Sequence, residues 1–117
     1  MVVGVLRLSY SLPGNATLKG KRQIVRRIVE RTRNRFNAAV SEVDLLDEPR
    51  RAVLGVAVTS NEGSHANEML DKIQAFTLGL TEAVLVDSRI ELIPVGELEH
   101  GLVRDTGYLP ADWSEDR

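Results

Sequence analysis

The 117-residue chain contains no cysteine and carries a formal net charge of −2, with 17 acidic and 15 basic side chains. The absence of cysteine excludes disulfide bonds, thiolate metal sites and thiol catalysis. The length suits one folded domain rather than two independent cores. No apolar run approaches the roughly 20 residues that cross a bilayer, and the first twelve residues alternate in polarity, unlike a signal peptide. We therefore expect a cytoplasmic protein with no membrane association.

Hydrophobic periodicity predicts six elements within residues 1–95. Alternating apolar and polar side chains predict strands over residues 2–12, 39–46, 51–60 and 83–95. Helical spacing of apolar side chains predicts one helix over residues 18–36, capped by Thr17, and a second over residues 65–80. This order predicts an α+β, ferredoxin-like β-α-β-β-α-β sandwich, in which a four-stranded antiparallel sheet carries both helices on one face. Residues 96–117 are rich in Gly, Asp and Glu, and we expect a flexible or weakly docked tail.

Positive charge is concentrated in the first predicted helix. Residues 19–35 hold eight basic side chains and one acid, Glu30, a local charge of +7; the remaining seven basic and sixteen acidic side chains give −9. The eight basic residues are Lys19, Lys21, Arg22, Arg26, Arg27, Arg31, Arg33 and Arg35. At about 100° per residue, these side chains flank the apolar stripe in two rows: Lys19, Arg22, Arg26 and Arg33 on one flank, and Arg27, Arg31 and Arg35 on the other.

The two rows of basic side chains support two interpretations. Guanidinium groups match the geometry of phosphates, so the eight residues are candidates for contact with a nucleic-acid backbone. Alternatively, the arginines pair with the chain's own excess acids, and their stems cover apolar edges. Only five aromatic side chains are present, which argues against base stacking on the sheet and favours recognition of backbone or shape.

Candidate catalytic groups are few. The turn over residues 13–22 joins a strand to a helix as phosphate-binding loops do, but it lacks the G-x-x-x-x-G-K-[ST] and G-x-G-x-x-G spacings. Neither His65 nor His100 has a patterned carboxylate partner. Glu42 and Asp44 are expected on one strand face, which fits a solvated or arginine-paired surface better than acid–base catalysis. We expect a non-enzymatic protein with no cofactor and no metal.

Four segments of the chain resemble the YlxP-like family of small bacterial proteins of unknown function. They are residues 3–6 (VGVL), 12–22 (LPGNATLKGKR), 35–43 (RFNAAVSEV) and 51–57 (RAVLGVA). The resemblance implies a ferredoxin-like fold. Because the family's genes lie among those of translation-initiation and ribosome-maturation factors, it also implies a role near ribosomal RNA. It supplies no catalytic residues, and Gly20 stands where the family usually has Asp or Glu.

Three functional hypotheses follow, of which the first is primary. The chain is a non-enzymatic RNA-associated factor whose partner is ribosomal RNA or a ribosomal subunit. The second hypothesis is a protein-interaction or oligomerisation module, including a homodimer, whose basic helix docks on an acidic surface. The third is an enzyme of the acylphosphatase kind, which requires an arginine-bearing anion loop and an asparagine after the first strand. Here that loop offers Asn15 and lysines in a different order.

Overall fold

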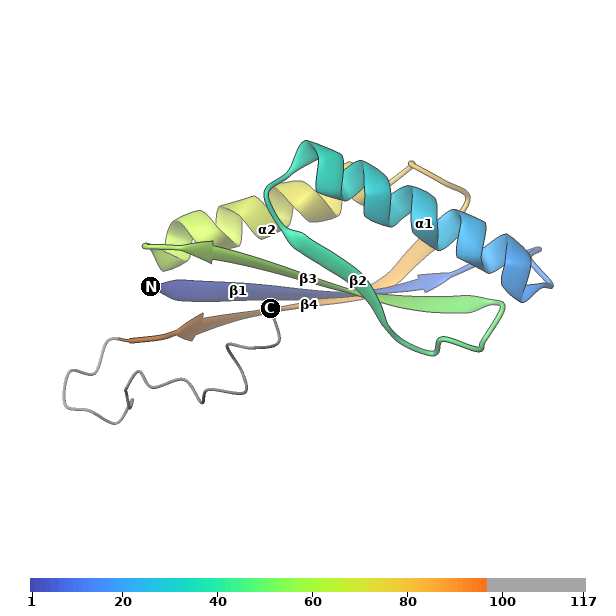
Figure 1. Ribbon diagram of the computed structural model, residues 1–117, viewed down its shortest axis with the longest axis horizontal. Helices are drawn as coiled ribbons and strands as arrows, with labels where there is room; N and C mark the ends of the chain where they lie inside the picture. The colour runs from blue at the N-terminus through green and yellow to red at the C-terminus, as the bar shows by residue number, and fades with distance from the viewer. Residues whose placement is uncertain (97–117) are drawn as a thin grey trace, which may run out of the picture.

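Two helices cover one face of a four-stranded sheet in the computed structural model of this protein, which describes residues 1–96 (Figure 1). The elements are β1 Val2–Ser11, α1 Leu18–Arg35, β2 Ala39–Asp44, β3 Arg51–Ser60, α2 Gly63–Thr77 and β4 Val84–Pro94. This β-α-β-β-α-β order and its antiparallel sheet confirm the predicted ferredoxin-like α+β fold.

The sheet has the strand order β2-β3-β1-β4, and neighbouring strands are antiparallel. The central strands β1 and β3 pair along their whole length, from Val2 opposite Ser60 to Ser11 opposite Arg51. It follows that β1 and β2 run parallel with β3 between them, and that each helix crosses over one intervening strand. The sheet therefore has two edges, formed by β2 and β4.

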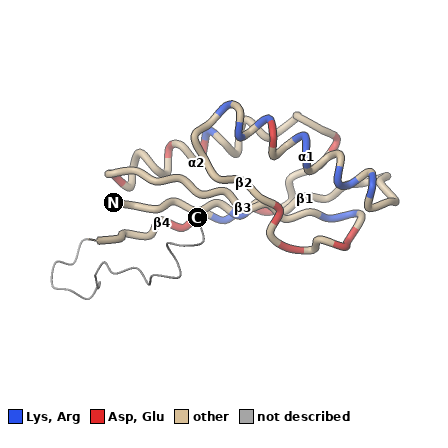
Figure 2. Tube along the Cα trace, viewed as in Figure 1, with Lys and Arg blue, Asp and Glu red and all other residues tan. Residues whose placement is uncertain are grey.

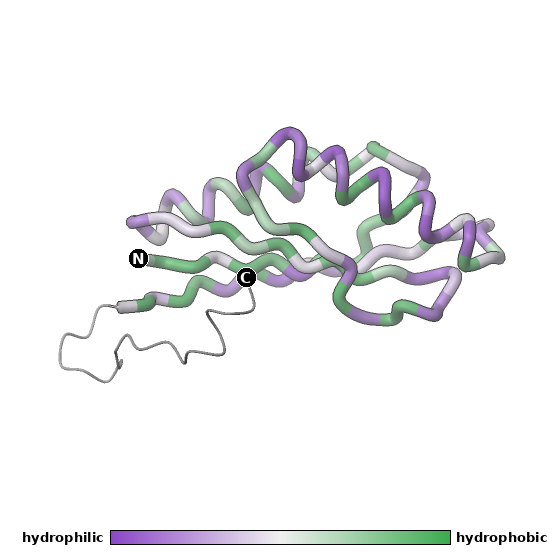
Figure 3. The backbone as a smooth tube through the Cα atoms, viewed as in Figure 1, coloured by the Kyte–Doolittle hydropathy of each residue, from purple (hydrophilic) through white to green (hydrophobic). Residues whose placement is uncertain are grey.

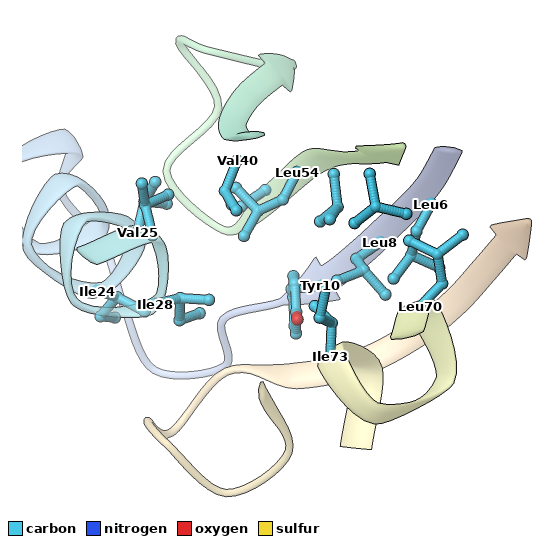
Figure 4. Packing of buried hydrophobic residues seen from close by; sticks show 14 of the residues in the cluster. Leu6, Leu8, Tyr10, Ile24, Val25, Ile28, Val40, Leu54, Leu70 and Ile73 are labelled. Atoms are coloured by element: carbon cyan, nitrogen blue, oxygen red, sulfur yellow. The ribbon is translucent and has the colours of Figure 1, made fainter. Parts of the chain in front are cut away.

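The core lies between the sheet and the two helices (Figure 4). Its side chains come from alternate strand positions and from one face of each helix, as the two periodicities require. They include Leu6, Leu8, Tyr10, Leu54, Val56, Ile24, Ile28, Leu70 and Ile73. Tyr10 donates a 2.9 Å hydrogen bond to Thr77 Oγ1, and burial raises the pKa of its phenol, an effect that this hydrogen bond opposes. Figure 3 shows hydrophobic segments along β1 and β3 and hydrophilic ones along much of α1.

Bulges in the two edge strands change which side chains share a face. Strict alternation would place Val84, Val86, Ile90 and Leu92 together. However, the pairing of β1 with β4 shifts register between Ser9 and Tyr10. Ile90 and Leu92 therefore lie opposite Leu6 and Gly4 on the helix-covered face, while Val84 lies opposite Ser11 on the open face. An extra residue in a strand reverses the alternation beyond it.

The structure also corrects the ends of two predicted elements, β2 and α2, by two or three residues. β2 ends at Asp44, before the predicted residue 46, because Leu45 adopts a left-handed backbone with a φ of 53°. α2 begins two residues earlier and ends three residues earlier than predicted. Neither α1 nor α2 is long and apolar enough to cross a membrane. The predicted tail beyond Gly96, which includes His100, lies outside the described residues.

Candidate nucleic-acid interface

The start of α1 is held by hydrogen bonds. Gly14 adopts a φ of 82°, which glycine tolerates without strain. Thr17 caps the helix, since its Oγ1 accepts a 3.0 Å hydrogen bond from the Gly20 N–H. Asn15 Nδ2 donates to the carbonyl oxygens of Thr17, at 2.8 Å, and Pro49, at 2.6 Å. The amide nitrogen that the acylphosphatase hypothesis requires for an anion is thus bound to the chain's own backbone.

Gly20 leaves room for this arrangement, which yields a testable prediction. A Cβ atom at residue 20 would collide with Asn15 Oδ1, so Gly20→Ala must displace the two Asn15 hydrogen bonds. Each bond contributes about 1 kcal/mol, and the helix propensity of alanine returns about 1 kcal/mol. We expect Gly20→Ala to destabilise the parent chain by about 1 kcal/mol and to stabilise an Asn15→Ala chain. Urea unfolding of the four proteins measures this coupling, and equal effects in both backgrounds would contradict the collision.

Lys21 lies inside the protein. Its side chain is fully buried, its Nζ donates a 2.5 Å hydrogen bond to the Leu45 carbonyl oxygen, and Glu42 Oε2 lies 2.9 Å from the same Nζ. The contact with Glu42 is an ion pair without hydrogen-bond geometry, so Oε2 has no hydrogen-bond donor. The assignment of Lys21 to the nucleic-acid surface is therefore wrong. Helical phase could have shown it, because Lys21 precedes Val25 by four residues and Ile28 by seven, on the apolar stripe.

Glu42 and Asp44 lie on opposite faces of the sheet, which corrects the prediction that they share one. The pairing of β2 with β3 shifts register between them. Glu42 faces α1 and pairs with Lys21, whereas Asp44 Oδ2 lies 3.2 Å from Arg7 Nη2. Asp44 also accepts a 2.8 Å hydrogen bond from the Leu45 N–H. The two carboxylates pair with separate cations and do not form a joint acid–base site.

The other seven basic side chains of α1 are exposed. They are Lys19, Arg22, Arg26, Arg27, Arg31, Arg33 and Arg35, and Figure 2 shows the basic residues recurring along the whole helix. Among residues 1–96 the ion pairs are Arg7–Asp44 and Lys21–Glu42. None of the seven side chains therefore forms an ion pair with an acid in the described part of the chain.

Contacts at the end of α1 show what each row of basic side chains faces. Arg33 Nη2 donates a 2.6 Å hydrogen bond to the Val40 carbonyl oxygen of β2, so its row faces the β2 edge. The Arg35 guanidinium lies 5.8 Å from the ring centre of Phe36 and 5.6 Å from that of Phe76 in α2, so the other row faces α2. The two contacts hold these guanidinium groups in place while leaving further N–H donors on each.

A shallow hollow of about 340 Å³ lies between the two rows, on the exposed face of α1. Its lining residues are Gln23, Arg26, Arg27, Glu30, Arg31 and Asn34. The lining thus holds three arginines against a single acid, Glu30, and two side-chain amides supply additional donors. A phosphate at this place would meet a local excess of positive charge and several hydrogen-bond donors.

Other candidate chemistry is not assembled in the structure. His65 lies in the first turn of α2, where its Nδ1 is 3.1 Å from Ser60 Oγ. Within residues 1–96, no three side chains of the metal-ligating types His, Asp and Glu gather in one place. The basic face of α1 therefore remains the strongest candidate site in the described structure.

Comparisons with known proteins give the same family as the sequence segments. A model of the family described as "Protein of unknown function (DUF503)" matches residues 3–90. The chain is also 31% identical over 75 residues to "Uncharacterized protein YlxP" of Bacillus subtilis (strain 168), an alignment that covers 64% of this chain and 82% of that relative. The matched region of the family model contains α1 and the turn that precedes it.

Proposed function

This chain belongs to the DUF503 family of proteins of unknown function, and we propose that it binds RNA without enzymatic activity, through phosphate contacts along the exposed face of α1. The observation that carries this proposal is the set of seven exposed basic side chains in the two rows of α1, none of them paired with an acid of residues 1–96. From Lys19 to Arg35 they extend over roughly 24 Å of helix. That length suits a polyanion better than a single small anion.

The residue types favour phosphate over other anions. Six of the seven exposed basic side chains are arginines, whose planar fork of N–H donors matches phosphate oxygens. The open face of β1 carries Val3, Val5, Arg7, Ser9 and Ser11 and that of β3 has no aromatic side chain, so these two strands offer no platform for stacked bases. We therefore expect recognition of the RNA backbone with modest sequence preference.

Like charges along α1 supply a second supporting argument. Arg22 and Arg26 are four residues apart, as are Arg27 and Arg31, and Arg31 and Arg35. Each such pair on a helix surface costs a few tenths of a kcal/mol, about 0.2–0.5. A bound polyanion would remove this repulsion, so binding should also raise the thermal stability of the protein.

Binding across a salt series tests the proposal. We expect the full chain to bind structured RNA and small ribosomal subunits with an affinity that falls steeply as salt rises. The logarithm of the association constant falls as the logarithm of the salt concentration rises, and each lost phosphate contact makes this slope less steep by about 0.7–0.9. The triple variant Arg26→Gln, Arg27→Gln, Arg31→Gln should therefore reduce the slope by about 2 to 3, and the corresponding triple change to Glu should abolish binding.

A matched control separates the α1 face from net charge. Arg50→Gln, Arg51→Gln and Lys72→Gln remove three positive charges from exposed residues outside α1, and this variant should keep most of the slope. Failure of the parent chain to bind at low salt, or equal losses in both triple variants, would sink the proposal. If the chain binds ribosomal subunits and an excess of unrelated RNA does not displace it, the partner is an acidic protein surface.

A further inference from the structure

The outer edge of β4 offers a regular row of backbone hydrogen-bonding groups. Within residues 1–96, β1 is the strand paired with β4. The Val95 N–H donates a 2.8 Å hydrogen bond to the Met1 carbonyl oxygen, and the register runs without a shift from Pro94 to Asp87. Because backbone groups alternate in direction along a strand, those of Ser88, Ile90 and Leu92 point away from the sheet.

Residues 87–93 contain no lysine, proline or bulge, although the charged side chains of Asp87, Arg89 and Glu91 lie along this stretch. Natural edges are commonly blocked by lysine, proline or a bulge. Here Pro94 and the register shift near Tyr10 lie at the two ends of this stretch, and neither interrupts it. β2, the opposite edge, has six residues and a bulge of its own.

β4 also exposes apolar side chains. Of the eight large hydrophobic side chains that are exposed among the described residues, four belong to this strand: Val84, Val86, Leu92 and Ile93. Leu92 and Ile93 lie on opposite faces of the sheet, 40% and 43% exposed. A partner that extends the sheet past β4 would cover side chains on both faces at once, which a partner docking on one face would not.

We propose that the partner is a second copy of this chain, whose β4 pairs antiparallel with β4 of the first around a two-fold axis at Ile90. This register places Arg89 opposite Glu91 of the partner subunit, and symmetry repeats the pair. A register centred on Arg89 or on Glu91 would oppose like charges. One centred on Ser88 would draw the bulged region near Val86 into the pairing. Among the registers centred on residues 88–91, charge and backbone regularity thus favour the one centred on Ile90.

The resulting dimer has one continuous sheet of two four-stranded halves. The two-fold axis of an antiparallel strand pair is perpendicular to the sheet, so the helices of both copies lie on the same side. Each α2 then lies nearer the axis and each α1 nearer an outer end. The proposal of a dimer rests on the β4 edge alone and is independent of the proposed RNA binding.

A backbone variant provides the decisive test, read as molar mass by light scattering or sedimentation. We expect the parent chain to reach twice the 13.0 kDa of one chain. Ser88→Pro removes an outward N–H, a change that an edge strand tolerates, and should give the mass of one chain with an unchanged circular dichroism spectrum. Ser88→Ala keeps the N–H and should remain dimeric.

Charge exchange tests the register. Arg89→Glu or Glu91→Arg alone places like charges opposite each other twice and should weaken association about tenfold. The double variant should restore it. Residue 89 lies opposite Arg7 in its own sheet. Because Arg89→Glu replaces a like charge there by an opposite one, it should not disturb the monomer.

Two outcomes would overturn the proposal. The first is a parent chain that stays monomeric at all concentrations, whatever the reason, including occupation of the edge by its own residues 97–117. The second is a Ser88→Pro variant that remains folded and dimeric.

Discussion

Replacing Lys21 with methionine should lower the free energy of unfolding by about 3 kcal/mol. Breaking a buried ion pair by removing one partner leaves the other charge uncompensated, at a cost of about 3–5 kcal/mol. The expected value is near the lower limit because the Glu42 side chain keeps 17% exposure to water. The Leu45 carbonyl oxygen also loses the hydrogen bond that Lys21 Nζ donates. Denaturant unfolding measures the loss.

The variants around Lys21 separate an ion pair from simple packing. Glu42→Gln leaves a fully buried ammonium without its carboxylate and should cost at least as much as Lys21→Met. The double variant Lys21→Met, Glu42→Leu removes both charges, and much of the lost stability should return. Lys19→Met on the exposed side of the same helix should change stability by less than about 0.5 kcal/mol. If the loss of unfolding free energy in the double variant equalled the sum of the losses in the two single variants, Lys21 and Glu42 would not be an ion pair.

Replacing Gly4 with alanine should destabilise the protein by about 2 kcal/mol. A Cβ atom there would lie 2.9 Å from Leu70 Cδ1, 3.2 Å from Val58 Cγ2 and 3.3 Å from Ala66 Cβ. All three neighbours are buried between β1, β3 and α2, so none can move away freely. Overpacking of such a site costs about 1–3 kcal/mol. Urea unfolding monitored by circular dichroism gives the value.

Gly55 provides the control for Gly4. A Cβ atom at Gly55 would lie at the same 2.9 Å, but from Val43 Cγ1. Val43 is 52% exposed and can rotate into solvent, so Gly55→Ala should cost well under 1 kcal/mol. Equal losses of stability in Gly4→Ala and Gly55→Ala would show that the cost of a close contact does not depend on whether the neighbouring side chain is buried.

The two predictions on Lys21 and Gly4 concern stability and should be separable from binding. Lys21 lies on the buried face of α1 and is absent from the exposed basic face. A folded Lys21→Met protein should therefore keep the salt slope of the parent in RNA binding. A reduced slope would mean that the internal pair also holds the exposed arginines in position.

Local side-chain period in the sequence was sufficient to predict all six elements and their order, whereas the family was indicated by the resemblance of four sequence segments. The strand Arg51–Ser60 was predicted to the residue, and helical phase placed seven basic side chains on the exposed side of α1. These features follow from the fixed rotation of about 100° per residue in a helix and 180° in a strand. They require no knowledge of distant partners.

The partners across the sheet were decided only by tertiary structure. The bulge in β2 turns Glu42 toward Lys21 and Asp44 toward Arg7, although the sequence places both carboxylates at the same strand parity. The bulge in β4 likewise sets the uninterrupted edge around Ile90. A bulge arises from the long-range register between strands, and the period of a single strand carries no record of it. Local sequence thus determined which elements form, whereas strand pairing decided which charges meet and which of the two edges of the described sheet has a regular backbone.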